Sequence, residues 1–481
     1  MKRYWGAVAL TVVIAGFIII NKANAATSPL SQKEIADLAK PAIVKIVQKV
    51  KGEAKVPIIE ISFSDLAVGL KPGTELQTVS VDEYLTGTGV VVHPDGYIMT
   101  NSHVVSYQTV KNLIAAEFIS AAIEESYARM GEEEIKKIQE SHSQEELDGF
   151  GEKIADFFME KSQFDLEKAI TVLDPSSKKE KLEELVAEGF AAKMVSVNDD
   201  FYRDSRDAAL IKIEENNLPA LGPNLSENVS TGKRVFIFGY PSTAEISERD
   251  ILEPTFTQGS ISAVKDSIKR DFKIFQTDAK ISKGSSGGPL LAENGSIIGL
   301  VTFITSDLVK QDGDSFAFAV PINIAQEIIK DHLLSGQTIP EFSVSDFERH
   351  FRLGLDLLNS NQCQKAIAEF SAAAEVNEKF SVNRYLEPYA QRCGGIIQAG
   401  GSVDNFWDQL KSSARNVSGL TWIVLLTVIL AIAAMFFIWL WLFRRVRRDE
   451  KEMDNIERAL SLDLETGEKR NEGQGEIRKE E

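Results

Sequence analysis

Three side chains in this sequence could act as a nucleophile, a base and a supporting carboxylate. Ser286 lies in the segment KGSSGGP, His103 follows an apolar hairpin pattern in TNSHVV, and Asp207 opens the short strand pattern DAALIK. A serine hydroxyl is a weak nucleophile at neutral pH, so it needs a base within hydrogen-bond reach, and imidazole has a suitable pKa. A buried carboxylate would hold the imidazole in one tautomer and stabilise its transient charge. The order His103, Asp207, Ser286 therefore predicts acyl transfer through a serine nucleophile.

The glycines around Ser286 predict a tight turn with a second role. Such a turn would let the backbone N–H groups of Gly284 and Ser286 converge on an oxyanion that develops during acyl transfer. Ser285 offers a second hydroxyl beside the first, but the spacing to the Gly-Gly-Pro sequence favours Ser286 as the nucleophile.

Each of these motifs also has a plainer interpretation. A Gly-Ser-Ser-Gly-Gly sequence is usually a flexible turn, and His103 could simply end a strand. Asp207 could be a helix cap or an ion-pair partner, and Asp199, Asp200 and Asp204 are close enough in sequence to compete for its role. The order of the three motifs and their contexts favour the catalytic interpretation. The four other histidines suggest no metal-ligand cluster, so we expect chemistry without a metal or a cofactor.

Further motifs flank the three positions. The segments TGTGVVV and HPDGYIMTN precede His103, FQTDA precedes the nucleophile segment, and FAFAVPI follows it. These motifs resemble the HtrA (Deg) group of trypsin-like serine proteases, over residues 80–105 and 195–335. The resemblance implies a protease domain over residues 26–338, built from two six-stranded β-barrels with the site between them. It also implies unfolded or mislocalised proteins as substrates, and a homo-oligomer, since members of the group often form trimers.

The sequence departs from that group in three places. Ser285 stands where the group usually has Asn, and no PDZ-like region is recognisable after the protease. The third departure is an insertion, residues 107–193, where other members have a short connection. Apolar residues three and four apart, such as Phe118, Ile119 and Ile123, predict that it is helical. Its helices could cap the site, gate substrates, mediate self-association or be passive.

The strand pattern GLVTFI, from residue 299, is expected beside the nucleophile. Leu300, Val301 and Thr302 are the predicted lining of the substrate pocket. The pattern holds no acid that would attract a basic side chain, so we expect an uncharged residue before the cut.

A helical unit is predicted over residues 341–397. Leu353, Gly354, Ala366, Phe370 and Ala373 resemble the pattern of one tetratricopeptide repeat, in which small side chains let two antiparallel helices approach. A third helix is expected from Asn383 to Arg392, with Gly394 and Gly395 as its C-cap.

Cys363 and Cys393 would then lie at the same end of this helical unit. They could form a disulfide in an oxidising compartment, or remain two buried thiols. These are the only cysteines among 481 residues, which excludes a disulfide-dense scaffold.

Targeting patterns mark both ends of the chain. Residues 1–25 combine a basic start, an apolar stretch and a small-residue cleavage site, as in a secretory signal peptide, although an uncleaved anchor is an alternative. Residues 420–443 form an apolar run long enough to span a membrane, after a linker over residues 398–419. Four arginines follow the run, so the polar tail, residues 444–481, is expected in the cytoplasm and the protease outside it, at the cell membrane.

Charge and composition narrow the classes of partner. The net charge is −18 and hydrophobic residues make up 43% of the chain, so nucleic acid is not an expected partner and the chain can build more than one core. The favoured interpretation is a membrane-anchored serine endopeptidase that cleaves unfolded or damaged proteins. A proteolytically inactive chaperone or a sensor on the same fold is the alternative.

Overall fold

The computed structural model describes residues 30–225, 228–242, 251–267, 271–302 and 317–398. The predicted signal peptide, membrane span and tail, residues 1–25, 420–443 and 444–481, lie outside these ranges. Within the described ranges, no helix has both the length and the apolar character to cross a membrane.

The first β-barrel draws its strands from both sides of the insertion. Its six strands follow the closed order β1-β4-β5-β8-β7-β6, and each neighbouring pair is antiparallel. They are β1 (Ile43–Val56), β4 (Gln77–His93), β5 (Tyr97–Thr100), β6 (Gln163–Val172), β7 (Phe190–Val197) and β8 (Ala209–Ile213). Gly96 makes the β4–β5 turn at φ +87°, where a Cβ atom would lie 2.3 Å from the carbonyl oxygen of Ile213.

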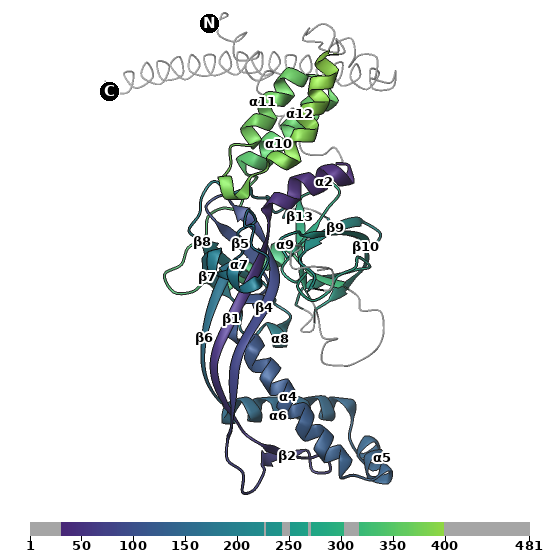
Figure 1. Cartoon of the computed structure of the whole chain (residues 1–481). Helices are drawn as coiled ribbons and strands as arrows, with labels where there is room; N and C mark the ends of the chain where they lie inside the picture. The colour runs from purple at the N-terminus through teal and green to yellow at the C-terminus, as the bar shows by residue number, and fades with distance from the viewer. Residues whose placement is uncertain (1–29, 226–227, 243–250, 268–270, 303–316, 399–481) are drawn as a thin grey trace, which may run out of the picture. The chain divides into compact units, whose positions relative to one another are not determined.

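The second β-barrel is continuous in sequence. Its closed order is β10-β11-β14-β13-β12-β9, again antiparallel throughout. The strands are β9 (Arg234–Gly239), β10 (Thr255–Asp266), β11 (Lys273–Thr277), β12 (Pro289–Leu291), β13 (Ile297–Thr302) and β14 (Ala317–Pro321), and helix α9 (Ile322–Asp331) follows them. Two closed six-stranded barrels confirm the fold expected from the sequence (Figure 1).

The insertion is only partly helical. Helices α4 (Tyr107–Ala128), α5 (Glu132–Ser141) and α6 (Gln144–Lys161) confirm the helical prediction for its first part. The prediction is wrong for β6 and for the start of β7, which close the first barrel and flank helix α7 (Leu182–Glu188). In β6, half-buried and exposed residues alternate with the period of two that a strand requires, a pattern that the helical interpretation passed over.

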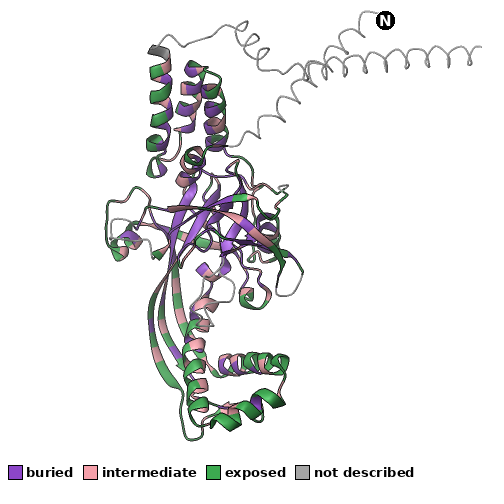
Figure 2. Cartoon of the chain, turned by 90° about the vertical axis from the view of Figure 1, so that its right-hand side faces the viewer, coloured by how far each residue is buried: buried purple, intermediate pink, exposed green. Residues whose placement is uncertain are grey.

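An arm of three strands extends from the first barrel. β1 pairs with β4 as far as Val56 and with β6 as far as Lys55, and the hairpin of β2 (Ile59–Ser62) and β3 (Ala67–Leu70) joins β1 to β4. One face of the arm shares a hydrophobic cluster with α4 and α6, in which Phe150, Ile154 and Phe158 are buried. Buried residues gather mainly in the barrels, while the arm and these helices are largely exposed or half-buried (Figure 2).

Side chains of β6 and β1 form hydrogen bonds to the joint between the short helix α3 (Ser102–Val105) and α4. Ser106, the one residue between the two helices, caps α4 by accepting a hydrogen bond from the N–H of Gln108 at 3.0 Å. The Lys168 ammonium of β6 donates to the carbonyl of Val105 at 2.8 Å, and Gln48 of β1 donates to the same carbonyl at 3.3 Å. The arm and the helix that carries His103 are therefore directly bonded.

Three helices follow the barrels, where the sequence predicts a helical unit. They are α10 (Asp346–Asn359), α11 (Cys363–Ala373) and α12 (Asn383–Gln398), with the 3₁₀ turn η5 (Glu378–Phe380) between the last two. A Cβ atom on Gly354 would lie 2.5 Å from the ring of Phe370, so the close packing of α10 on α11 requires glycine there. The resemblance to one tetratricopeptide repeat stays a prediction.

The end of α12 differs from the prediction. The helix continues through Gly394 and Gly395, neither of which has a positive φ, so the predicted C-cap is wrong. Ile396, the residue directly after Gly395, packs against the core, and this contact favours continued helix over termination. Cys363 and Cys393 are two buried free thiols, and burial together with a hydrogen bond to Cys363 raises the pKa of Cys393 to about 12.

The helical unit packs against the barrels through a buried carboxylate. Glu348 of α10 accepts a hydrogen bond from the N–H of Gly222 at 2.7 Å and pairs with Arg352 at 2.7 Å. Arg352 also donates to the carbonyl of Asn294 at 2.6 Å. At the N-terminal side, helix α2 (Gln32–Ala39) and the 3₁₀ turn η1 (Lys40–Ala42) lead into β1, and α2 contacts α12 through the bond from Tyr389 to Asp37, 2.7 Å long. These contacts join the unit to the protease core.

The half-buried amine of Lys168 predicts a pH-dependent stability. Burial lowers the pKa of Lys168 from 10.5 to about 8, against the charge of Asp199, which raises it. At pH values between the folded pKa of about 8 and the unfolded pKa of 10.5, the unfolded chain binds more protons at Lys168 than the folded chain does. The free energy of unfolding should therefore rise with pH over this range. Lys168→Met keeps the packing of the aliphatic part of the side chain. It should flatten the rise of the unfolding free energy with pH, measured by urea denaturation at a series of pH values. An equal slope in both proteins would contradict a half-buried amine at this joint.

Candidate active site

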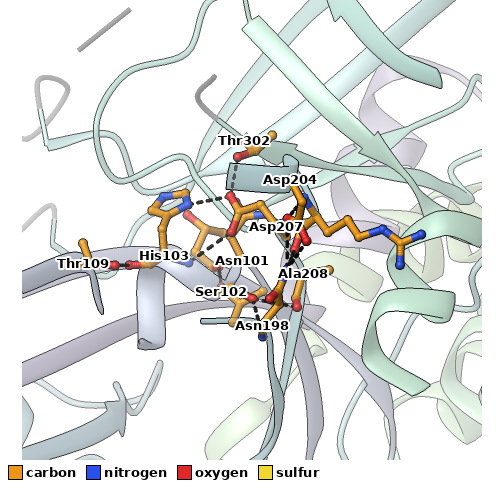
Figure 3. A network of polar contacts seen from close by, with 12 residues as sticks. Asn101, Ser102, His103, Thr109, Asn198, Asp204, Asp207, Ala208 and Thr302 are labelled. Atoms are coloured by element: carbon orange, nitrogen blue, oxygen red, sulfur yellow. Dashed lines mark hydrogen bonds and ion pairs between the residues drawn. The ribbon is translucent and has the colours of Figure 1, made fainter. Parts of the chain in front are cut away.

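Helix α3 places His103 at the mouth of the first barrel, directly after the β4–β5 hairpin. Asn101 donates from its side chain to the carbonyl of Asp207 at 2.7 Å, and Ser102 donates from its hydroxyl to the carbonyl of Ala208 at 2.8 Å. These bonds link the helix to the segment that leads into β8 (Figure 3). The two predicted site residues, 104 positions apart, are thereby held side by side.

The carboxylate of Asp207 binds His103 twice. Its Oδ2 lies 2.7 Å from Nδ1 of the imidazole, and its Oδ1 accepts the backbone N–H of His103 at 3.0 Å. Thr302 of β13 donates its hydroxyl to the same Oδ2 at 2.5 Å (Figure 3). With Nδ1 turned towards the carboxylate, Nε2 is the ring nitrogen on the opposite side.

Asp207 stays ionised although it is 5% exposed. Burial by itself raises the pKa of this carboxyl, but the charge of His103 and the hydrogen bonds from His103 and Thr302 outweigh it. The pKa of Asp207 therefore lies below its ordinary value, and the group is a carboxylate at neutral pH.

The neighbouring aspartates have other partners. Asp199 accepts a hydrogen bond from the hydroxyl of Ser106. Asp204 accepts from the side chain of Asn198 at 3.1 Å and from the N–H of Arg206 at 2.8 Å. Among the four aspartates that could have supported the base, Asp207 is the one hydrogen-bonded to His103.

The Ser286 loop is bonded to both barrels. The N–H of Thr88 in β4 donates to the carbonyl of Ser286 at 2.8 Å, and the N–H of Gly287 donates to the carbonyl of Val301 in β13 at 2.9 Å. A Cβ atom on Gly287 would lie 3.1 Å from the backbone nitrogen of Asn101, two residues before His103. The loop therefore lies against the segment that carries the imidazole.

The side chain of Ser285 lies within its own loop and against β9. The Ser285 hydroxyl accepts a hydrogen bond, at 3.5 Å, from the N–H of Ser282, within the loop itself. The side chain also lies against β9, since a Cβ atom on Gly239 would be 3.0 Å from that of Ser285. Ser285 therefore points into the second barrel.

Gly284 takes a conformation that other residues rarely adopt. Its φ is +97°, and a Cβ atom would lie 2.2 Å from the carbonyl oxygen of Tyr240. None of the hydrogen bonds found between described residues uses the N–H of Gly284 or of Ser286.

The residues predicted to line the substrate pocket are buried. Leu300 and Val301 are fully buried, each in a hydrophobic cluster, and the Thr302 hydroxyl is bonded to Asp207. Their side chains face packed interior and the carboxylate, not an open pocket. In the described part of the chain, no group of three or more His, Cys, Asp or Glu residues could hold a metal ion.

Sequence reasoning missed two threonines of the site. Thr302 was assigned to the pocket, and Thr88, which bonds the Ser286 loop through its N–H and the carbonyl of Gly284 through its hydroxyl at 2.7 Å, was not singled out. Both contacts join residues far apart in the chain, and threonine is common in strands for other reasons. No local signal could have identified them.

Comparisons with known proteins find similarity to serine peptidases. A model of the trypsin-like peptidase domain matches residues 169–300, which include Asp207 and Ser286. The serine endoprotease DegS of Haemophilus influenzae is 23% identical over 342 residues, covering 70% of this chain and 71% of the relative. A probable periplasmic serine endoprotease, DegP-like, of Chlamydia pneumoniae is 37% identical over 139 residues, but these cover 28% of this chain and 26% of that protein.

Solved structures of related proteins match more loosely. The HtrA-type protease AlgW, solved with a decapeptide, is 18% identical, with a TM-score of 0.34 over 63% of this chain and 67% of that chain. By these matches, the chain contains a region similar to the trypsin-like peptidase domain and resembles serine endoproteases of the HtrA/DegS type.

Proposed function

We propose that Ser286, His103 and Asp207 cleave peptide bonds through an acyl-enzyme. The bond between the His103 imidazole and the buried Asp207 carboxylate carries this proposal, because it turns Nδ1 inward and assigns the base to Nε2. His103 takes the proton of the Ser286 hydroxyl as its oxygen attacks the substrate carbonyl carbon. The N–H groups of Gly284 and Ser286 stabilise the oxyanion that forms.

The remaining steps use the same groups. His103 returns the proton to the leaving amine, which departs with the C-terminal half of the substrate and leaves an ester on Ser286. Water, deprotonated by His103, then attacks the ester and releases the N-terminal half. No step requires a cofactor, and the carboxylate of Asp207 stays ionised throughout while it balances the imidazolium.

We further propose unfolded or damaged proteins outside the cytoplasm as substrates. The names of several relatives describe periplasmic endoproteases, and AlgW was solved with bound peptides. The sequence pattern of residues 420–443 supports a membrane anchor, and that of residues 1–25 supports export. Self-association as a trimer rests on the family resemblance.

Alanine substitutions should show which of the two adjacent serines is the nucleophile. We expect Ser286→Ala and His103→Ala to abolish both fluorophosphonate labelling and casein digestion by the full chain in detergent. Ser285→Ala is the matched control and should keep labelling, because its hydroxyl faces the second barrel. Labelling lost in Ser285→Ala but kept in Ser286→Ala would reverse the assignment. Casein cleavage that persists in Ser286→Ala would contradict serine catalysis at this site.

Loss of the Asp207 carboxylate should lower kcat far more than loss of the hydrogen bond that Thr302 donates to it. Asp207→Asn should lower kcat by about 10⁴-fold, because the amide would hold the imidazole in the wrong tautomer. Thr302→Val removes one hydrogen bond to the carboxylate and should lower kcat by about 10-fold, while Thr302→Ser should restore it. Steady-state kinetics on a chromogenic peptide would measure all three. An unchanged kcat in Thr302→Val would show that the bond to β13 does not support the base.

A further inference from the structure

One edge of strand β4 has no partner along most of its length. β1 pairs with β4 from Gln77 to Val90, whereas β5 pairs with the opposite edge only from Val90 to His93. Within the part of the chain that the structure describes, no other strand pairs with β4. The edge that faces away from β1 is therefore unpaired over the whole arm.

The contacts of Thr88 show which backbone groups face this edge. Its N–H donates to the carbonyl of Ser286 at 2.8 Å, and its own carbonyl accepts the Thr100 hydroxyl at 2.7 Å, so both groups point away from β1. The register of β4 with β1 is continuous from Val90 to Gln77, so every second residue repeats this orientation.

Five residues therefore present their N–H and carbonyl groups at an open edge. They are Thr78, Ser80, Asp82, Tyr84 and Thr86. No hydrogen bond between described residues uses any of these backbone groups. The first three residues are exposed, and the last two are half-buried.

The insertion helices pack on one face of the arm, where their hydrophobic cluster includes Val81 of β4. The Lys168 ammonium lies 4.2 Å from the ring of Tyr107, and that of Lys111 lies 5.4 Å from the ring of Phe164. Both contacts join α4 to β6, which β1 separates from β4. The helix thus begins over the far side of the arm.

The open edge leads directly to the nucleophile. It starts two residues before Thr88, which is bonded to Ser286, and a Cβ atom on Gly87 would lie 2.5 Å from Val104, the neighbour of His103. In the proposed reaction His103 protonates the leaving amine, so the leaving half of the substrate must lie on the side of His103. β4 belongs to the same barrel as that helix.

We propose that the open edge binds the substrate on the C-terminal side of the cut, as an added antiparallel strand. This proposal rests on the proposed function and specifies its substrate class. β4 runs towards Ser286, and the leaving half of a substrate runs away from it, so the two strands are antiparallel. At about 3.3 Å per residue, the nine residues from Thr78 to Thr86 match about nine substrate residues.

Such an edge selects substrates by conformation. Backbone hydrogen bonds do not depend on side-chain identity, and an unfolded segment readily offers an extended, free backbone to a sheet edge. Sheet edges are commonly shielded by proline, lysine or a bulge, and the segment from Thr78 to Thr86 has none of these. The chain therefore requires of its substrate an extended, unfolded stretch beyond the cleaved bond.

The length of the leaving half should set KM. Two fluorogenic peptides with the same residues up to the cut and either two or ten residues after it would be compared on the full chain in detergent. We expect KM to be at least 10-fold lower for the longer peptide. N-methylation of alternate backbone nitrogens in its C-terminal part should remove this gain, because the methyl group replaces a donor. Equal KM values for the two peptides would overturn the proposal.

A proline on the edge provides the matching change in the protein. Ser80→Pro removes an N–H that β1 does not use, so the arm can keep its pairing. We expect KM for the long peptide to rise about fivefold relative to KM for the short one, which corresponds to one hydrogen bond of about 1 kcal/mol. Glu83→Ala is the control, since the backbone of Glu83 faces β1, and it should leave the ratio unchanged. A ratio unaffected by Ser80→Pro would overturn the proposal.

These outcomes are distinct from failure of the proposed function. If Ser286 were not the nucleophile, Ser286→Ala would still cleave the short peptide, whatever the length dependence. If Ser80→Pro proved unfolded by circular dichroism, the N-methylated peptides would decide the question on the unaltered protein.

Discussion

The buried carboxylate of Asp207 is the interaction on which the two barrels and the site depend. Removing a carboxylate from water costs several kcal/mol unless hydrogen bonds and an opposite charge replace the lost solvation. Here His103 supplies two contacts from the first barrel and Thr302 supplies one from the second. The charge that orients the imidazole is therefore satisfied only when the barrels are docked. Correct domain packing and a correctly oriented base are the same condition.

The position of the Ser286 loop also depends on docking of the two barrels. It belongs to the second barrel, yet the N–H of Thr88 in the first barrel bonds its carbonyl, and Gly287 leaves no room for a side chain against Asn101. A displacement between the barrels would break these contacts together with the bond from Thr302 to Asp207. The geometry that we assign to catalysis therefore depends on the interface between the barrels.

The sequence predicts the chemistry of this site better than the structure around it. Ser286, His103 and Asp207 stand in local patterns that constrain their backbone, a glycine turn, a hairpin end and a strand start, so the sequence alone could single them out as candidates. Thr302 could not be inferred, because its role depends on a contact across 95 positions of the chain. The barrel strand β6 was hidden because it follows three helices within an insertion. Gly394 misled for a different reason, since glycine permits a helix end without requiring one.

The open edge of β4, like the role of Thr302, could not be predicted from the sequence. The alternation from Thr78 to Thr86 is polar and half-exposed, as on the surface of any sheet, and only the register and the Thr88 contacts reveal which backbone groups are unpaired. An unpaired edge of this length normally promotes association between copies of a chain. Here Asp82 lies on it and the chain carries a net charge of −18, so two copies brought edge to edge would repel each other. An unfolded substrate of ordinary charge would not be repelled in this way, and this difference allows the edge to stay open to substrates while it resists self-pairing.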